Sequence, residues 1–327
     1  MKPHANRANI TIPRGLPLKR YGALFVIFGS ALWGTDALFR RPLTASLSPV
    51  TIVLLEHCLL ALVTLPVLAR YRVEFGRLNR RDYAALLFIA LGGSVAATSL
   101  FTFAMKYGNP SVVILLQKAQ PLFTVLLARI FLGERPARRF WPWFALAIAG
   151  AYLMSEPDWS AGLQLSPGRP VVILSAIGAA ALWGSATVCG RYVVPRIPTL
   201  FLTALRFIFA LPALAILFWL QPANQRVLPA GITPVLNVAG MALIAGLAAL
   251  LLYYRGLKSI TASLASVCEL SFPVAAVALN RIVLGVHLSS LQFLGSAVLI
   301  TSVTTLAALN ANERGRTRPD DPKLIRS

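Results

Sequence analysis

The sequence predicts an all-α integral membrane protein: ten transmembrane helices, arranged as two inverted five-helix repeats around a central cavity. Three observations lead to this prediction. Of the 327 residues, 57% are hydrophobic and only 13% are charged, against about 25% charged residues in soluble domains. The tetrapeptide Ala-Leu-Trp-Gly occurs at both 31–34 and 181–184. Basic residues also collect in alternate loops, as they do in membrane proteins.

A second repeated motif supports the duplication. The pentapeptide Arg-Ile-Phe-Leu-Gly at 129–133 resembles Arg-Ile-Val-Leu-Gly at 281–285, and Pro121 and Pro273 precede the two copies in register. Self-similarity at nearly constant spacing indicates a duplicated structural unit. We therefore expect repeats at 19–155 and 171–310, with a periplasmic linker at 156–170 between them. The polar segments 1–18 and 311–327 are expected to be cytoplasmic tails.

Ten apolar segments match, or nearly match, the roughly 20 helical residues that cross a hydrocarbon core. The fifth is short, and we expect its tryptophans at the membrane interface. The first has no small-residue cleavage site, so it is expected to remain as a membrane helix. The predicted helices lie at 21–39, 49–68, 83–105, 111–128, 140–154, 171–189, 199–220, 234–254, 262–280 and 291–309.

The distribution of basic residues predicts the orientation. If the N-terminus is cytoplasmic, 23 of the 31 Lys and Arg residues lie on that side. Because cytoplasmic loops hold the excess of positive charge, we expect both termini in the cytoplasm. Five helices per half is an odd number, so the second half would enter the membrane upside down. The loops agree, since 70–81 carries five arginines and its counterpart 221–233 carries one.

The net charge of +20 does not indicate a nucleic-acid partner, because the basic residues lie in short loops and tails instead of on one face. The sequence has no phosphate-binding Gly-x-x-x-x-Gly-Lys loop, no His-Glu-x-x-His and no Gly-x-Ser-x-Gly. Three dispersed histidines and three dispersed cysteines do not form a metal site. We expect neither an enzyme nor a bound cofactor or metal.

An inverted repeat has a mechanical consequence. Two inverted copies are related by a pseudo-two-fold axis in the membrane plane, so the same packing can close either face, with a substrate site near the midplane. The repeat therefore predicts a transporter that works by alternating access. A non-transporting structural membrane protein is the alternative from another class.

These features resemble the drug/metabolite transporter superfamily and its EamA-type repeat, over about residues 20–310. The resemblance lies in five helices per repeat, Ala-Leu-Trp-Gly at both starts, a proline midway along helices 4 and 9, and the exits Leu-Gly-Glu and Leu-Gly-Val. Because Val286 stands where the first half has Glu134, the resemblance supports no role for an acid in the second half. Within the family, the chain is similar to bacterial aromatic amino acid exporters.

The resemblance implies a protein of the bacterial inner membrane that exports amino acids, with aromatic and other bulky apolar side chains favoured. Export of cationic or amphipathic drugs and metabolites is the alternative. The partners implied are a small-molecule substrate and the lipid bilayer. Coupling to protons would require Glu56, Glu269 or His57 to change protonation, whereas facilitated diffusion would not.

Several charged or titratable residues fall within the predicted helices. A charge at a helix centre costs about 2.5 to 3.5 kcal/mol, so such residues are expected to face a cavity or one another. As candidate substrate-binding residues we take Glu56, His57, Lys118, Arg206 and Glu269. Asp36 lies at the end of the first helix, where the sequence favours a local ion pair with Arg40 and Arg41.

Lys118 and Glu269 lie shortly before Pro121 and Pro273. A proline removes one backbone hydrogen bond, so these two prolines are expected to kink their helices and to act in gating. Lys118 and Glu269 would either surround the amino and carboxyl groups of a substrate or pair with each other between helices 4 and 9.

Glu56 is expected to pair with Arg206 or Lys118, because an ion pair neutralises both partners in a low dielectric. His57 corresponds to Arg206 when the halves are aligned on Pro49 and Pro198. It would either carry a proton or pack as a histidine bonded to a neighbour.

Aromatic residues complete the predicted site. Trp33 and Trp183 occupy equivalent positions beside glycines and would line the cavity or pack between helices. Tyr253 and Phe101 are expected to extend this apolar wall. Small residues let helices approach closely or flex, which we expect at 92–93 and at Gly246.

Overall fold

Apolar runs form helices throughout the part of the chain that the structure describes. The computed structural model describes residues 21–108, 113, 116–153, 170–284 and 289–316, and its regular secondary structure there is helical. The helices are α1 (Gly22–Trp33), α2 (Asp36–Thr44), α3 (Pro49–Arg70), α4 (Arg80–Phe88), α5 (Ala97–Tyr107), α7 (Gln120–Leu132), α8 (Phe140–Leu153), α9 (Pro170–Val193), α10 (Thr199–Leu220), α11 (Ile232–Gly240), α12 (Ala249–Leu257), α13 (Ala262–Glu269), α14 (Ser271–Leu284) and α15 (Ser290–Arg316).

Within the described residues, seven helices or helix pairs are long and apolar enough to cross a membrane, and they lie where the sequence predicts helices 1, 2, 3, 6, 7, 8 and 10. Shorter apolar helices, 120–132, 140–153 and 262–275, lie in the segments predicted for helices 4, 5 and 9. Residues 111, 112, 114 and 115 of the predicted fourth helix lie outside the described residues. The all-helical prediction is therefore confirmed for the described chain, and the number of ten crossings stays a prediction.

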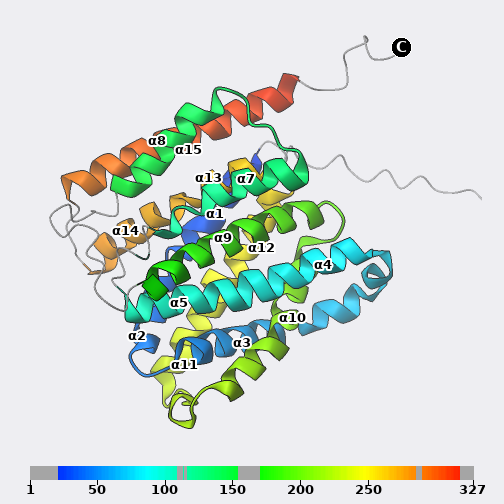
Figure 1. Cartoon of the computed structure of the whole chain (residues 1–327), viewed down its shortest axis with the longest axis vertical. Helices are drawn as coiled ribbons and strands as arrows, with labels where there is room; N and C mark the ends of the chain where they lie inside the picture. The colour runs from blue at the N-terminus through cyan, green and yellow to red at the C-terminus, as the bar shows by residue number, and fades with distance from the viewer. Residues whose placement is uncertain (1–20, 109–112, 114–115, 154–169, 285–288, 317–327) are drawn as a thin grey trace, which may run out of the picture.

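The helices lie roughly side by side in one bundle (Figure 1). At one edge α8 packs along α15, and at the opposite edge α3 packs along α10. Between these edges the two halves exchange partners. α1 packs on α12 and α14 of the second half, whereas α9, its counterpart, packs on α5 and α7 of the first half. Each half therefore holds the first helix of the other by equivalent contacts.

Glycines permit these close contacts. A Cβ atom on Gly29 of α1 would lie 2.8 Å from the Ala249 carbonyl oxygen, and one on Gly184 of α9 would lie 3.0 Å from the Gln120 carbonyl oxygen. Distances this short cannot be kept by a larger residue, so these positions let the backbones touch. Gly184 belongs to the repeated tetrapeptide, and this contact with α7 gives a structural reason for its glycine.

The third predicted helix of each half contains a π-helical segment. The two segments, Ile89–Ala96 and Met241–Ala248, lie 152 residues apart in the chain. They contain the glycines for which the sequence predicts close approach or flexing. A Cβ atom on Gly93 would lie 2.8 Å from Ala186 Cβ, so the first segment does lie close against α9. π-Helical turns are rare and are often found at functional sites.

The helices are interrupted shortly before each of the two prolines for which the sequence predicts a kink. The chain forms a turn at 118–119, and α7 then begins at Gln120 with Pro121 in its first turn. In the second half α13 ends at Glu269, and α14 begins at Ser271, two residues before Pro273. Proline lacks the N–H that would bond to the carbonyl group four residues before it, which explains an interruption at these positions. The gating role of the two prolines stays a prediction.

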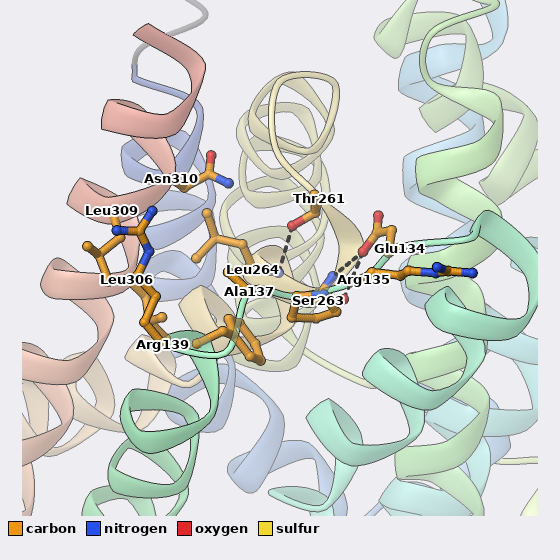
Figure 2. Close-up of a pocket in the computed structure, with 12 residues that line it drawn as sticks. Glu134, Arg135, Ala137, Arg139, Thr261, Ser263, Leu264, Leu306, Leu309 and Asn310 are labelled. Atoms are coloured by element: carbon orange, nitrogen blue, oxygen red, sulfur yellow. Dashed lines mark hydrogen bonds between the residues drawn. The ribbon is translucent and has the colours of Figure 1, made fainter. Parts of the chain in front are cut away.

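The Leu-Gly-Glu segment at 132–134, at the end of α7, connects the two halves through hydrogen bonds. Gly133 ends α7 in the left-handed conformation, with φ of 65°. Glu134 then accepts hydrogen bonds from the backbone N–H groups of Ala262 and Ser263, at 2.8 and 3.0 Å, and from Ser263 Oγ at 2.8 Å (Figure 2). A carboxylate at a helix N-terminus satisfies free N–H groups and complements the helix dipole. Glu134 therefore caps α13 from the other repeat.

We expect Glu134→Ala to destabilise the protein by about 1 to 3 kcal/mol, because the buried N–H groups at the start of α13 lose their acceptor. Thermal unfolding of the purified protein in detergent measures the effect. Glu74→Ala is the matched control, since Glu74 pairs with the exposed Arg77 at 2.8 Å and surface pairs contribute about 0 to 1 kcal/mol. Equal melting temperatures for the two variants would contradict the capping role.

Candidate functional site

A pocket of about 140 Å³ opens between the loop after α7 and the end of α15 (Figure 2). None of the substrate-binding residues predicted from the sequence lines it. The predicted residues lie instead in polar and aromatic contacts between the helices, and these contacts form the candidate site.

Glu269 is the centre of the first group of contacts. It is the last residue of α13 and is 8% exposed. Its Oε1 accepts hydrogen bonds from Tyr253 Oη at 2.7 Å and from Thr187 Oγ1 at 3.3 Å, and its Oε2 accepts one from Gln120 Nε2 at 2.5 Å. We call Gln120, Thr187, Tyr253 and Glu269 the Glu269 cluster. It joins α7 of the first half to α9, α12 and α13 of the second.

Aromatic rings extend this cluster in two directions. The ring of Trp33 lies 5.2 Å from that of Tyr253, and the ring of Tyr253 lies 5.5 Å from that of Tyr254. Tyr254 Oη accepts a hydrogen bond from Arg206 Nη1 at 2.9 Å, and Arg206 Nε donates to Ser94 Oγ at 2.7 Å. A continuous series of polar and aromatic contacts therefore connects the carboxylate of α13 with the guanidinium of α10.

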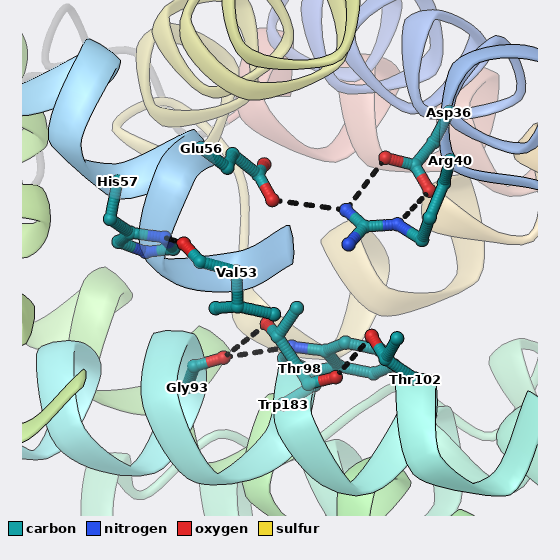
Figure 3. A network of polar contacts seen from close by, with 9 residues as sticks. All are labelled: Asp36, Arg40, Val53, Glu56, His57, Gly93, Thr98, Thr102 and Trp183. Carbon is teal, nitrogen blue, oxygen red and sulfur yellow. Dashed lines mark hydrogen bonds and ion pairs between the residues drawn. The ribbon is translucent and has the colours of Figure 1, made fainter. Parts of the chain in front are cut away.

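Trp183 lies against the π-helical segment of the first half. Its Nε1 donates to the carbonyl oxygen of Gly93 at 2.9 Å (Figure 3). Its ring lies 5.2 Å from that of Phe101. The predicted aromatic residues are thus found in two pairs, Trp33 with Tyr253 and Trp183 with Phe101. Both tryptophans are half-buried, so part of each ring remains accessible.

The sequence predicts that Glu56 pairs with Arg206 or Lys118, but its partner is Arg40. Its Oε2 accepts from Arg40 Nη2 at 3.0 Å, and Arg40 also binds both carboxylate oxygens of Asp36, at 2.6 and 2.8 Å (Figure 3). The predicted pair of Asp36 with Arg40 is confirmed, but Arg40 is buried and Arg41 is exposed. A residue expected at the interface therefore lies inside the bundle.

Lys118 bonds to a partner that the sequence did not predict, whereas His57 has one of its two expected roles. Lys118 Nζ donates to the carbonyl oxygen of Ala151 at 2.5 Å, and the residue of α7 that reaches Glu269 is Gln120. His57 is 3% exposed, with Nδ1 2.9 Å from the Val53 carbonyl oxygen and its ring edge-on to Phe207. These contacts are those of a packed histidine, the second of the two interpretations of the sequence.

The two halves carry opposite charges at equivalent positions. Because α3 and α10 begin 150 residues apart, at Pro49 and Thr199, the counterpart of Arg206 is Glu56, one residue from the predicted His57. Each side chain lies beside a glycine of the opposite half's π-helical segment. A Cβ atom on Gly246 would be 3.6 Å from Glu56 Oε1, and one on Gly93 would be 3.6 Å from Arg206 Nη2.

The sequence did not identify four polar residues of these contacts as site residues: Ser94, Gln120, Thr187 and, as a buried group, Arg40. Serine and threonine are frequent in membrane helices, where they bond to their own backbone, so nothing distinguishes Thr187 in the sequence. Among the described residues, no group of three or more His, Cys, Asp or Glu side chains is arranged to hold a metal ion.

Comparisons with known proteins identify the family. The EamA-like transporter family matches the chain twice, over residues 20–156 and 170–308. A curated relative, the riboflavin transporter ImpX of Fusobacterium nucleatum, is 30% identical over 302 residues, which cover 88% of this chain and 98% of the relative. The uncharacterized transporter YwfM of Bacillus subtilis is 24% identical over 88% of this chain and 93% of its own length.

A solved crystal structure of a protein that is 21% identical has the same fold, with a TM-score of 0.74 over 92% of this chain and 99% of that one. The resemblance to the superfamily is thus confirmed, whereas the relative with a named substrate is a riboflavin transporter and not an amino acid exporter. The chain belongs to the EamA-like transporter family and is a multi-pass membrane transporter, not an enzyme.

Proposed function

We propose that the chain is a secondary transporter for a flat aromatic solute with several hydrogen-bonding groups, and that riboflavin is the first candidate. The observation that carries the proposal is the arrangement of Trp33, Tyr253, Trp183 and Phe101 around buried polar groups. A three-ring flavin needs aromatic surfaces to stack on and polar partners at its edges. The likeness to the Fusobacterium riboflavin transporter supports the same substrate.

The polar partners suit an uncharged solute. Between Glu269 and Arg206 the contacts include the amide of Gln120 and the hydroxyl groups of Thr187, Tyr253 and Tyr254. Such groups donate and accept hydrogen bonds, which matches the hydroxyl-bearing chain and the ring edges of riboflavin.

Aromatic amino acids are the second candidate. A carboxylate and a guanidinium belong to the same series of contacts, and together they would bind the ammonium and carboxylate groups of a zwitterion. This substrate class, and export as the direction of transport, come from the resemblance to amino acid exporters.

Alternating access is part of the proposal. Exchange of equivalent helix contacts between the halves is what a pseudo-two-fold axis in the membrane plane would produce. We propose ten crossings in two inverted repeats, 19–155 and 171–310, around a central substrate site. The excess of Lys and Arg in alternate loops supports cytoplasmic termini in a bacterial inner membrane.

Counterflow in liposomes tests the function. Purified protein is reconstituted into vesicles preloaded with riboflavin, phenylalanine or tryptophan, and accumulation of the labelled solute is followed. We expect accumulation with riboflavin that exceeds that of protein-free vesicles. Accumulation with the amino acids alone would favour the second candidate, and accumulation with none of the three would contradict both. Running the assay with and without a pH gradient tests proton coupling.

Replacing either Trp33 or Trp183 with alanine is expected to weaken substrate binding about tenfold, because a stacked ring contributes roughly 0.5 to 1.5 kcal/mol beyond its buried area. The half-saturating concentration in the counterflow assay measures the effect. Trp219→Ala is the control, since Trp219 is 67% exposed and lies beside Arg226. Unchanged half-saturation in both variants would remove the tryptophans from the site.

A further inference from the structure

Arg40 carries donors that no described residue accepts. The residue is 8% exposed. Its Nε and Nη2 donate to Asp36, and Nη2 also donates to Glu56. Its third nitrogen, Nη1, is buried and has no hydrogen-bond partner among the described residues. One edge of the guanidinium is therefore held by two carboxylates, while the other is unpaired.

An unpaired donor inside a protein is costly. Leaving a buried donor without an acceptor costs about 1 to 3 kcal/mol, and more for a charged group. Native structures satisfy nearly all such groups with protein or water partners, so an exception calls for an explanation. The cost here falls on a group that two carboxylates hold in a fixed orientation. A preorganised donor of this kind would lose little freedom on binding an acceptor.

The unpaired edge faces the interior of the bundle. In Figure 3 Nη1 lies on the edge of the guanidinium away from Asp36, and Thr98, Thr102 and Trp183 are drawn on that side of the view. The same proximity of α5 to this region is shown by Lys106, which donates to the Leu47 carbonyl oxygen, in the segment between α2 and α3. Arg40 therefore presents an unpaired donor edge on the side of Trp183, whose ring contacts that of Phe101.

We propose that Arg40 is a substrate-binding residue, and that its Nη1 donates to an acceptor oxygen of the solute that stacks on the Trp183 pair. This inference rests on the proposed function and specifies one contact within it. The chemical group recognised is a carbonyl or carboxylate oxygen: a ring carbonyl of a flavin, or the carboxylate of an aromatic amino acid. Asp36 and Glu56 are positioning residues that hold the guanidinium.

A matched pair of ligands tests this contact. Lumichrome has the flavin ring system with its two carbonyl groups but no sugar chain, and phenazine is a three-ring aromatic compound without carbonyl oxygens. Binding of each to the purified full chain in detergent is measured by fluorescence titration, with tryptophan quenching as the signal. Arg40→Lys keeps the positive charge near Asp36 and Glu56 but cannot present the planar pair of donors. Arg41→Lys, at the exposed neighbour, is the control.

We expect Arg40→Lys to weaken lumichrome and riboflavin binding about tenfold, as loss of one charge-assisted hydrogen bond implies. Phenazine binding should stay within about twofold of wild type, because stacking does not use the guanidinium. Arg41→Lys should bind all three compounds as the wild type does. A purely structural role for Arg40 would weaken lumichrome and phenazine equally, and that result overturns the inference, as does unchanged lumichrome binding.

A second variant covers the case in which Arg40→Lys does not fold. Asp36→Asn keeps the size of the side chain and one acceptor oxygen, so it loosens Arg40 without removing it. It should weaken lumichrome binding by a smaller factor than Arg40→Lys and leave phenazine binding unchanged, and equal losses for both ligands would overturn the proposal.

Failure of the proposed function gives a different result from failure of this inference. If the wild type binds phenylalanine but not flavins, the test of Arg40→Lys uses phenylalanine and phenethylamine as the ligand pair. Phenethylamine lacks the carboxylate. A wild type that binds none of these compounds contradicts the proposed function and this inference together.

Discussion

Glu269→Gln is expected to lower the initial rate of counterflow by about 10- to 100-fold. The carboxylate accepts hydrogen bonds from Tyr253, Thr187 and Gln120. A glutamine removes the negative charge and replaces one of the two acceptor oxygens with an NH₂ donor, so at least one of these partners must change from donor to acceptor. A hydrogen bond to a charged group contributes about 1.5 to 3 kcal/mol, and the loss of one such bond corresponds to this change in rate.

The cluster offers its own control for this prediction. Gln120 Nε2 and Glu269 Oε2 are 2.5 Å apart, so Gln120→Glu alone would place two carboxylates in contact and is expected to reduce transport as strongly. The double variant Gln120→Glu with Glu269→Gln restores one amide and one carboxylate at the same interface. We expect the double variant to recover part of the rate, because the effects of substitutions at two residues in contact are not additive.

The rates are compared in liposomes at equal amounts of monodisperse protein. Glu74→Gln, at an exposed ion pair, serves as the surface control. A Glu269→Gln variant that transports as fast as the wild type would show that the Glu269 cluster does not take part in transport.

The sequence predicts the positions of the helices better than it predicts which side chains contact one another. The geometry of a helix explains this difference. Apolar runs and two repeated motifs identify segments, and these tolerate an error of one or two residues. The prediction of side-chain contacts does not tolerate such an error, because successive residues of a helix are rotated by about 100° about its axis. Lys118 and Gln120 are two positions apart, so a repeat alignment with that uncertainty could not decide which of them faces Glu269. The turn at 118–119 changes the direction further.

The same limit applies to Glu56. When the halves are aligned on Pro49 and Pro198, the counterpart of Arg206 is His57. When they are aligned on the starts of α3 and α10, the counterpart of Arg206 is Glu56.

Arg40 shows a second limit of prediction from the sequence. It lies after the break between α1 and α2 at 34–35, and the repeat does not predict this break because α9 runs through the equivalent residues. The π-helical segments have no sequence signature apart from their glycines.

A substitution that fills the contact between α1 and α12 should have the other large effect. A Cβ atom on Gly29 would lie 2.8 Å from the Ala249 carbonyl oxygen and 3.0 Å from the Tyr253 backbone nitrogen. Both are backbone atoms of α12, so the helix itself must move to accommodate Gly29→Val. Overfilling a packed contact costs about 1 to 3 kcal/mol.

The displacement would reach the site, because α12 carries Tyr253, which packs against Trp33 and donates to Glu269. A shift of about 1 Å in a positioning residue can cost about 100-fold in rate. We therefore expect Gly29→Val to lower both the melting temperature and the counterflow rate, the latter by at least about tenfold.

Gly178→Ala separates this effect from the general cost of replacing a glycine in a membrane helix. Gly178 lies on α9, and the nearest heavy atom to its added Cβ would be Leu100 Cδ1 at 3.5 Å, an ordinary contact. Alanine also has the higher helix propensity, by about 0.8 to 1.0 kcal/mol. The Gly178→Ala variant should therefore keep its transport rate and unfold at the same or a higher temperature. If Gly29→Val transports as well as Gly178→Ala, the packing of α1 on α12 does not hold Tyr253 in place.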